Sequence, residues 1–139
     1  MKSSNLLVVF IVGLLLGCAK HNKICQKAQD KMMSQTFTGT IYLCNAQPPY
    51  MDNIEATANV SSIGSGIVSI HLISDTTLID TLLSYNINCQ VVETDIPIIF
   101  FEDDSQNEKG QYNQTPDRIS FSFNYQNCIN NTHFEGLAN

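Results

Sequence analysis

The chain has 139 residues, of which 43% are hydrophobic and 14% are charged, and its net charge is −6. This length fits a single domain, and the balance of apolar and charged residues is that of a globular body rather than a disordered one. Because thirteen acidic residues stand against seven basic ones, the chain repels phosphate backbones, which excludes nucleic acid as an expected partner.

An uninterrupted apolar run, Leu6–Gly17, follows Lys2 near the N-terminus. Twelve helical residues span about 18 Å, well short of the ~30 Å hydrocarbon layer of a membrane. The run is therefore typical of the hydrophobic region of an export signal. It ends in Leu15-Leu16-Gly17-Cys18, which resembles the lipobox of bacterial lipoproteins. The resemblance implies that residues 1–17 are a signal peptide and that Cys18 carries the lipid.

The residue after Cys18 is Ala19, not the aspartate that resembles an inner-membrane retention signal in enterobacteria. The resemblance therefore implies an outer-membrane lipoprotein of the cell envelope, facing the periplasm or the surface. Two or three acyl chains on Cys18 would hold the chain stably in the membrane. The alternative is an unmodified cysteine after an uncleaved or conventionally cleaved signal.

Residues 18–35 are predicted to form a lipid-anchored tether with a short helix, in which Ile24, Ala28 and Met32 share one face. Four of the seven basic residues lie here: Lys20, Lys23, Lys27 and Lys31. These lysines suit anionic headgroups beside the anchor. A solvated spacer that holds the domain off the bilayer is equally compatible with the segment.

Residues 36–139 are predicted to form a β-domain, because short alternating segments are separated by turn residues. The expected strands are residues 37–44, 54–60, 67–73, 78–93, 95–101, 118–125 and 132–138. The fourth segment is long enough for one bent strand or two short ones. Pro97 marks an edge, a bulge or a strand end. Residues 102–117 are predicted to be the longest loop.

Seven or eight such strands, with no helix signal after about residue 35, predict an all-β antiparallel meander. Alternation does not distinguish a sandwich from a barrel. Closure into an up-and-down barrel removes the exposed edges of a meander, so we expect a lipocalin-like barrel.

The lipobox, the opening segment Phe37-Thr38-Gly39-Thr40 and the closing segments Ile119–Tyr125 and Thr132–Gly136 resemble the small calycin-like, lipocalin-like β-barrel lipoproteins of Bacteroidetes. The resemblance covers most of the chain after Cys18. It implies the barrel and the anchor, but no functional residue is carried over from it.

Four cysteines remain once Cys18 is set aside, namely Cys25, Cys44, Cys89 and Cys128. An even number in an exported chain indicates disulfides, and their spacing is too wide for a zinc site. If the first and last strands pair to close the barrel, Cys44 comes near Cys128, which leaves Cys25 for Cys89. Free buried thiols are the alternative.

Aromatic residues on the predicted strands could line a cavity for one apolar ligand. They are Phe37, Phe121, Phe123, Tyr125 and Phe134. The same residues describe a filled core, which we expect here because a barrel of about eight strands can be packed solid by its own side chains.

Acidic residues in the predicted loop, Glu102, Asp103, Asp104 and Glu108, offer oxygen ligands to calcium. Their spacing does not match an EF-hand, so we expect a solvated loop, no metal and no cofactor. His133 and Glu135 share one face of the last strand, as a general base and its orienting carboxylate would.

No nucleophile motif accompanies that pair, and His71 is expected to be an exposed strand residue. We therefore expect no catalytic residue and no enzyme. The sequence favours a lipid-anchored envelope protein that binds a small apolar ligand or another envelope component. The alternatives are an inhibitor of a basic enzyme such as a lysozyme, which an acidic body suits, and a structural subunit of a surface assembly.

Overall fold

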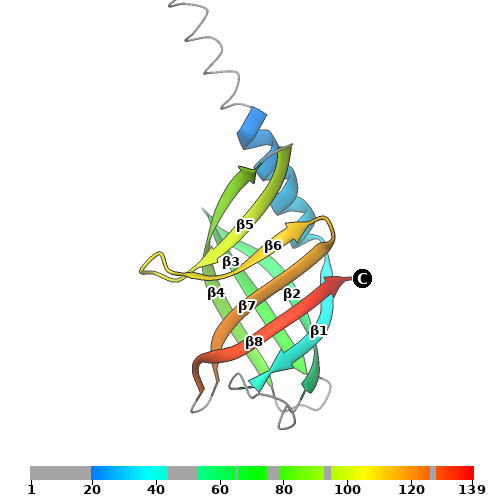
Figure 1. Ribbon diagram of the computed structural model, residues 1–139, viewed down its shortest axis with the longest axis vertical. Helices are drawn as coiled ribbons and strands as arrows, with labels where there is room; N and C mark the ends of the chain where they lie inside the picture. The colour runs from blue at the N-terminus through cyan, green and yellow to red at the C-terminus, as the bar shows by residue number, and fades with distance from the viewer. Residues whose placement is uncertain (1–19, 44–52, 65, 75–78, 93–94, 126–127) are drawn as a thin grey trace, which may run out of the picture.

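A computed structural model describes residues 20–43, 53–64, 66–74, 79–92, 95–125 and 128–139. A helix over residues 20–33 precedes the strands. The strands are β1 (Thr36–Tyr42), β2 (Asn53–Gly64), β3 (Ile67–Ser74), β4 (Asp80–Val92), β5 (Ile96–Glu102), β6 (Glu108–Gln114), β7 (Asp117–Tyr125) and β8 (Cys128–Ala138). Each strand pairs antiparallel with its neighbour, and β8 pairs with β1. The predicted up-and-down barrel with a short N-terminal helix is confirmed (Figure 1).

The prediction of a loop over residues 102–117 is wrong, because β6 lies within it and pairs with both β5 and β7. This strand places one large side chain in the core, the fully buried Tyr112. Gly110 is on the same face, and a Cβ there would overlap the carbonyl oxygen of Ser120 and lie 2.8 Å from the Cβ of Phe121. A polar strand with a single buried ring shows too little alternation to be recognised from sequence.

The long segment that the sequence left as one strand or two forms one continuous strand, β4. It is the longest strand of the sheet at 13 residues, whereas β5 and β6 have 7 each. In an antiparallel barrel this difference in length leaves part of β4 without the neighbour that the next hairpin would supply.

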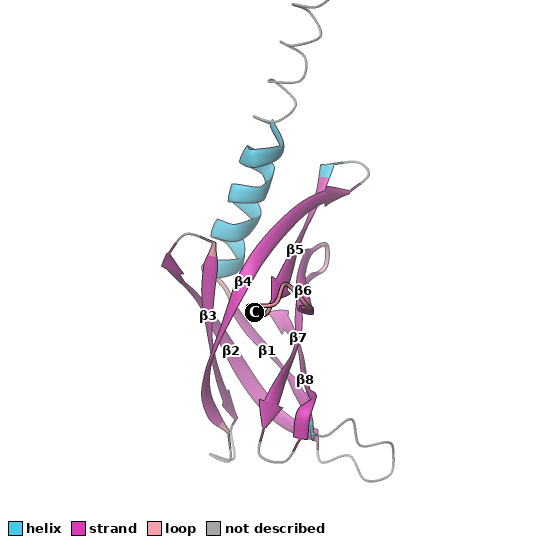
Figure 2. Ribbon diagram, turned by 90° about the vertical axis from the view of Figure 1, so that its left-hand side faces the viewer, coloured by secondary structure: helices cyan, strands magenta, loops and turns pink. Residues whose placement is uncertain are grey.

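The helix packs into the end of the barrel where β1 begins (Figure 2). Ala28 and Met32 on the predicted apolar face are fully buried and belong to the same core as the strands. The helix is therefore part of the folded body. Within the described residues, no helix combines the length and the apolar character needed to cross a membrane.

One carboxylate joins the end of the helix to the barrel. The Nζ atom of Lys31 lies 2.6 Å from Asp117 at the start of β7. The hydroxyl of Tyr112, whose ring is buried, donates a 2.7 Å hydrogen bond to the same carboxylate. Desolvation works to raise the pKa of Asp117, but the hydrogen bonds from Lys31, Tyr112 and Gln35 outweigh it, and the net pKa is lowered.

A disulfide between Cys25 and Cys89 fastens the helix to β4. This is the pairing that barrel closure predicts for these two cysteines. Cys44 and the side chain of Cys128 are outside the described residues, so their pairing remains a prediction. The β1–β8 ladder runs from Phe37↔Ala138 to Tyr42↔His133. The end of β1 and the start of β8 therefore lie at the same end of the barrel.

We expect the double substitution Cys25→Ala/Cys89→Ala to lower the free energy of unfolding by about 4 kcal/mol, because the bridge joins residues 64 apart and restricts the unfolded chain. Urea denaturation followed by circular dichroism measures the change. The reduced wild-type chain is the control and should lose at least as much. An unchanged midpoint in both would contradict a structural role for the bridge.

Candidate functional site

The interior of the barrel is filled by side chains. The ring of Phe121 is at its centre, with ring centroids 5.2 Å from Phe134, 6.0 Å from Tyr85 and 6.3 Å from Phe101. Of the five aromatic residues singled out in the sequence, four are buried, and Tyr125 packs partly buried against the core. Within the described part of the chain they form the expected packed core, so a ligand site must be sought elsewhere.

The wall of the barrel is interrupted between β4 and β7. The β4–β5 ladder begins at Asn86↔Glu102, and the β6–β7 ladder ends at Gly110↔Phe121. Beyond these pairs, residues 80–85 of β4 and 122–125 of β7 continue toward the end opposite the helix. The β5–β6 hairpin turns back before it reaches that end, so no ladder among the described strands joins β4 to β7 there.

A depression of about 270 Å³ occupies this interruption. We call it the side opening, and its lining residues come from β4, from β7 and from the β5–β6 hairpin. They are Leu83, Ser84, Tyr85, Ser122, Phe123, Asn124, Asp103, Asp104 and Lys109. The side opening thus combines apolar side chains from the edge of the core with charged side chains from one hairpin.

Tyr85 bridges the side opening from β4 to β7. Its hydroxyl donates a 3.0 Å hydrogen bond to the main-chain carbonyl of Ser122, while its ring packs against Phe101 and Phe121. Burial raises the pKa of the Tyr85 hydroxyl, so this group remains a neutral donor. A side chain therefore supplies a cross-strand link where the ladder is missing, and it forms the floor of the side opening.

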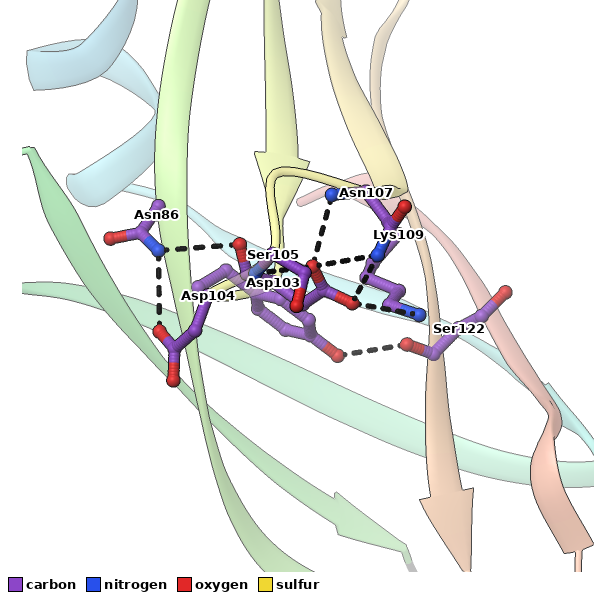
Figure 3. Close-up of polar contacts among 8 residues, drawn as sticks. Asn86, Asp103, Asp104, Ser105, Asn107, Lys109 and Ser122 are labelled. Carbon is purple, nitrogen blue, oxygen red and sulfur yellow. Dashed lines mark hydrogen bonds and ion pairs between the residues drawn. The ribbon is translucent and has the colours of Figure 1, made fainter.

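The connection between β5 and β6 is held in shape by Asp103 (Figure 3). One carboxylate oxygen accepts 2.9 Å hydrogen bonds from the backbone N–H groups of Ser105 and Asn107. The other oxygen lies 3.2 Å from Lys109 Nζ, and the Asn107 side chain also donates to Asp103. The bond from the Asn107 backbone is the main cause that lowers the pKa of Asp103 to about 2. Asp103 is thus ionised, and its carboxylate bonds to residues of its own hairpin.

Of the other acidic residues predicted in this loop, Asp104 also lines the side opening. The side-chain amide of Asn86 reaches Asp104 Oδ1 at 3.4 Å and the Asp103 carbonyl at 3.5 Å, which pins the loop to β4 (Figure 3). Glu102 accepts a 3.0 Å hydrogen bond from Asn88 on the outer wall. Among the described residues, no three or more His, Cys, Asp or Glu side chains gather in a way that would hold a metal ion.

His133 and Glu135 lie on the same outer face, as predicted. Ser122 Oγ is 3.4 Å from His133 Nδ1, and His133 Nε2 is 3.5 Å from Glu135. Both contacts exceed the ~2.6–3.2 Å of proton-transfer partners, and Glu135 lies closer to Arg118, at 2.7 Å. We therefore interpret this group as an Arg118–Glu135 ion pair on the outer wall, with His133 beside it.

A second depression, of about 340 Å³, lies on the outer wall beside this group, where Gly39 of β1 faces Gly136 of β8. His71, expected to be exposed on its strand, points outward and pairs with Asp80 at 2.7 Å. Neither feature joins the side opening.

Sequence reasoning identified the acidic loop but not the side opening itself. Leu83, Tyr85 and Ser122 carry no motif, and they become neighbours only through the unequal lengths of the strands. The sequence signal that could have indicated the side opening is the length of the β4 segment compared with the β5 and β6 segments that follow it. Cys18, the predicted lipid site, lies outside the described residues.

We expect Asp103 to titrate near pH 2 in a carbon-detected NMR titration, below the ordinary 3.8. Because its folded-state pKa is depressed, ionised Asp103 stabilises the loop above pH 3.8, and that contribution is lost as pH falls through about 2. Asn107→Ala should move the midpoint upward by removing a side-chain donor. Ser105→Ala is the control and should not, since only its backbone donates. A wild-type midpoint near 3.8 would contradict the assignment.

Comparison with known proteins finds no match: no protein-family model, no curated protein and no solved structure matches this chain. What is established is an eight-stranded antiparallel barrel with a packed aromatic core, a helix in one end and a side opening toward the other.

Proposed function

We propose that this protein is a lipid-anchored binding protein of the cell envelope, held in the outer membrane through Cys18. The support is the apolar run Leu6–Gly17 with a lipobox-like end, together with the resemblance to small barrel lipoproteins. The four other cysteines fit an oxidising compartment, and the Cys25–Cys89 bridge agrees with that.

The side opening is the observation that carries the binding role. It is a break in an otherwise continuous sheet, lined by Leu83 and Phe123 and rimmed by Asp103 and Asp104. It lies toward the end of the barrel opposite the helix, and the proposed anchor precedes that helix. A partner in the envelope would thus meet the side opening without obstruction from the membrane to which the chain is tied.

The size of the side opening favours a presented group over an enclosed ligand. Pockets that engulf small molecules hold about 300–1,000 Å³ and bury most of the ligand. The side opening holds about 270 Å³, and the interior is packed. The occupant is therefore a protruding group of another envelope component, such as an apolar side chain with a basic neighbour. A small apolar ligand seated against Leu83 and Phe123 is the alternative.

The anchor is tested by Cys18→Ser, which removes the acyl acceptor. We expect the variant to lose acyl labelling and to leave the membrane fraction, because the remaining N-terminal segment is too short to span a bilayer. Fractionation after high-salt and carbonate washes gives the result. Membrane retention of the unlabelled variant would show that something other than lipid at Cys18 holds the protein.

The binding site is tested with two adjacent leucines of β4. Leu83 lines the side opening, whereas Leu82 points outward and is 69% exposed. We expect Leu83→Asn to reduce the bound component by about tenfold, the usual effect of losing one apolar contact, and Leu82→Asn to retain it. Native mass spectrometry of protein purified from its own envelope measures the component.

Equal retention by both leucine variants, or a wild-type protein that carries nothing, would contradict binding at the side opening. Recovery in an assembly of fixed stoichiometry would instead indicate a structural subunit. Circular dichroism of both variants establishes that a loss at position 83 is not a loss of fold.

A protein inhibitor of a basic enzyme is the second candidate, favoured by the acidic side chains of Asp103 and Asp104 at the side opening. Inhibition of a basic muramidase at low salt but not at high salt would support it, because such attraction is screened. Asp104→Asn should weaken that inhibition.

A further inference from the structure

The tip of the β4–β5 hairpin is apolar on both faces. Val91 and Pro97 pair across the inner face, where Pro97 is buried. Val92 and Ile96 pair across the outer face, and each is 42% exposed. A strand that is apolar on both faces usually has a cover on both. The helix covers the inner face, and no described residue covers the outer pair.

The hairpin tip is tied to the beginning of the helix by two links. The Cys25–Cys89 disulfide joins the helix to β4 three residues before Val92. The Nζ atom of Lys20 lies 2.6 Å from the carboxylate of Asp95, next to Ile96. The ion pair is exposed and weak, but the disulfide is covalent and holds the two elements in this register. Figure 2 shows the helix and the β4–β5 hairpin reaching the same end of the molecule.

The proposed lipid site is close to this tip by chain geometry alone. Cys18 precedes Lys20 by two residues, and two residues span at most about 7 Å whatever their conformation. Lys20 is in turn in contact with Asp95. Acyl chains on Cys18 therefore bring Val92 and Ile96 to the surface of the bilayer.

The charge at this end fits a lipid surface. Lys20, Lys23 and Lys27 are exposed on the helix, and basic side chains beside an anchor are drawn to anionic headgroups. A small apolar pair beside a helix that exposes lysines, one of which reaches Asp95 at the tip, matches the boundary between headgroups and acyl chains.

From these observations we propose that the outer face of the β4–β5 tip, Val92 with Ile96, is a second membrane contact that inserts beside the lipid anchor and fixes the tilt of the barrel. The inference rests on the proposed lipid anchor at Cys18. The β2–β3 tip also exposes Ile63 and Ile67, but no described link ties it to the start of the helix, so we do not include it.

The absence of tryptophan from the chain allows a single indole to report on the contact. Val92→Trp places it at the tip. Leu82→Trp is the matched control, because positions 82 and 92 lie on the same strand and on the same outer face, about 33 Å apart. Both lipidated chains are reconstituted into vesicles of phosphatidylglycerol and phosphatidylcholine brominated on the acyl chains.

We expect bromine to quench the emission at position 92 about twofold, as for a side chain at the headgroup–acyl boundary, and to leave the emission at position 82 unchanged. Flotation of the same vesicles reports the anchor separately. Protein that floats without quenching at position 92, or with equal quenching at both positions, overturns the inference and leaves the anchor standing.

Protein that does not float and carries no acyl group overturns both proposals. A blue shift at position 92 that grows with protein concentration in the absence of vesicles also overturns the inference, since it would show that a second copy covers the tip.

Discussion

Closure of the barrel depends on the close approach of β1 and β8 at a pair of glycines. Gly39 faces Gly136, and a Cβ on Gly39 would overlap the carbonyl oxygen of Glu135. A Cβ on Gly136 would lie 2.7 Å from the ring of Phe134, so that ring occupies the place of the missing side chain. Aromatic rings laid over bare backbone in this way let a strongly coiled sheet meet itself without a void.

The rest of the core follows from that closure. Phe134 is held against Phe121, and Phe121 contacts Tyr85 and Phe101 across the interior. Because these rings fill the interior from β8 to β4, the described part of the barrel leaves no internal space for a ligand. The proposed binding role is therefore assigned to the wall, where the sheet is incomplete, rather than to the interior.

Alternation predicted most of the strands, because residues such as Phe121 and Phe123 face one way at every second position over a long segment. It missed β6, where only Tyr112 reaches the core and Gly110 leaves room for a neighbour. The Cys25–Cys89 bridge followed from topology. The side opening could not be predicted in this way. It depends on where the β4–β5, β5–β6 and β6–β7 ladders end relative to one another, and no local pattern of residues encodes those positions.

The position of one turn sets the size of the side opening. The β5–β6 hairpin reverses at residues 103–107, and each added pair of residues would extend both strands one step further along β4 and β7. Small insertions or deletions at this surface turn, where they are tolerated, would thus widen or seal the side opening. The packed rings, the glycine pair and the helix would stay as they are. The shape of the side opening can thus change independently of the barrel that carries it.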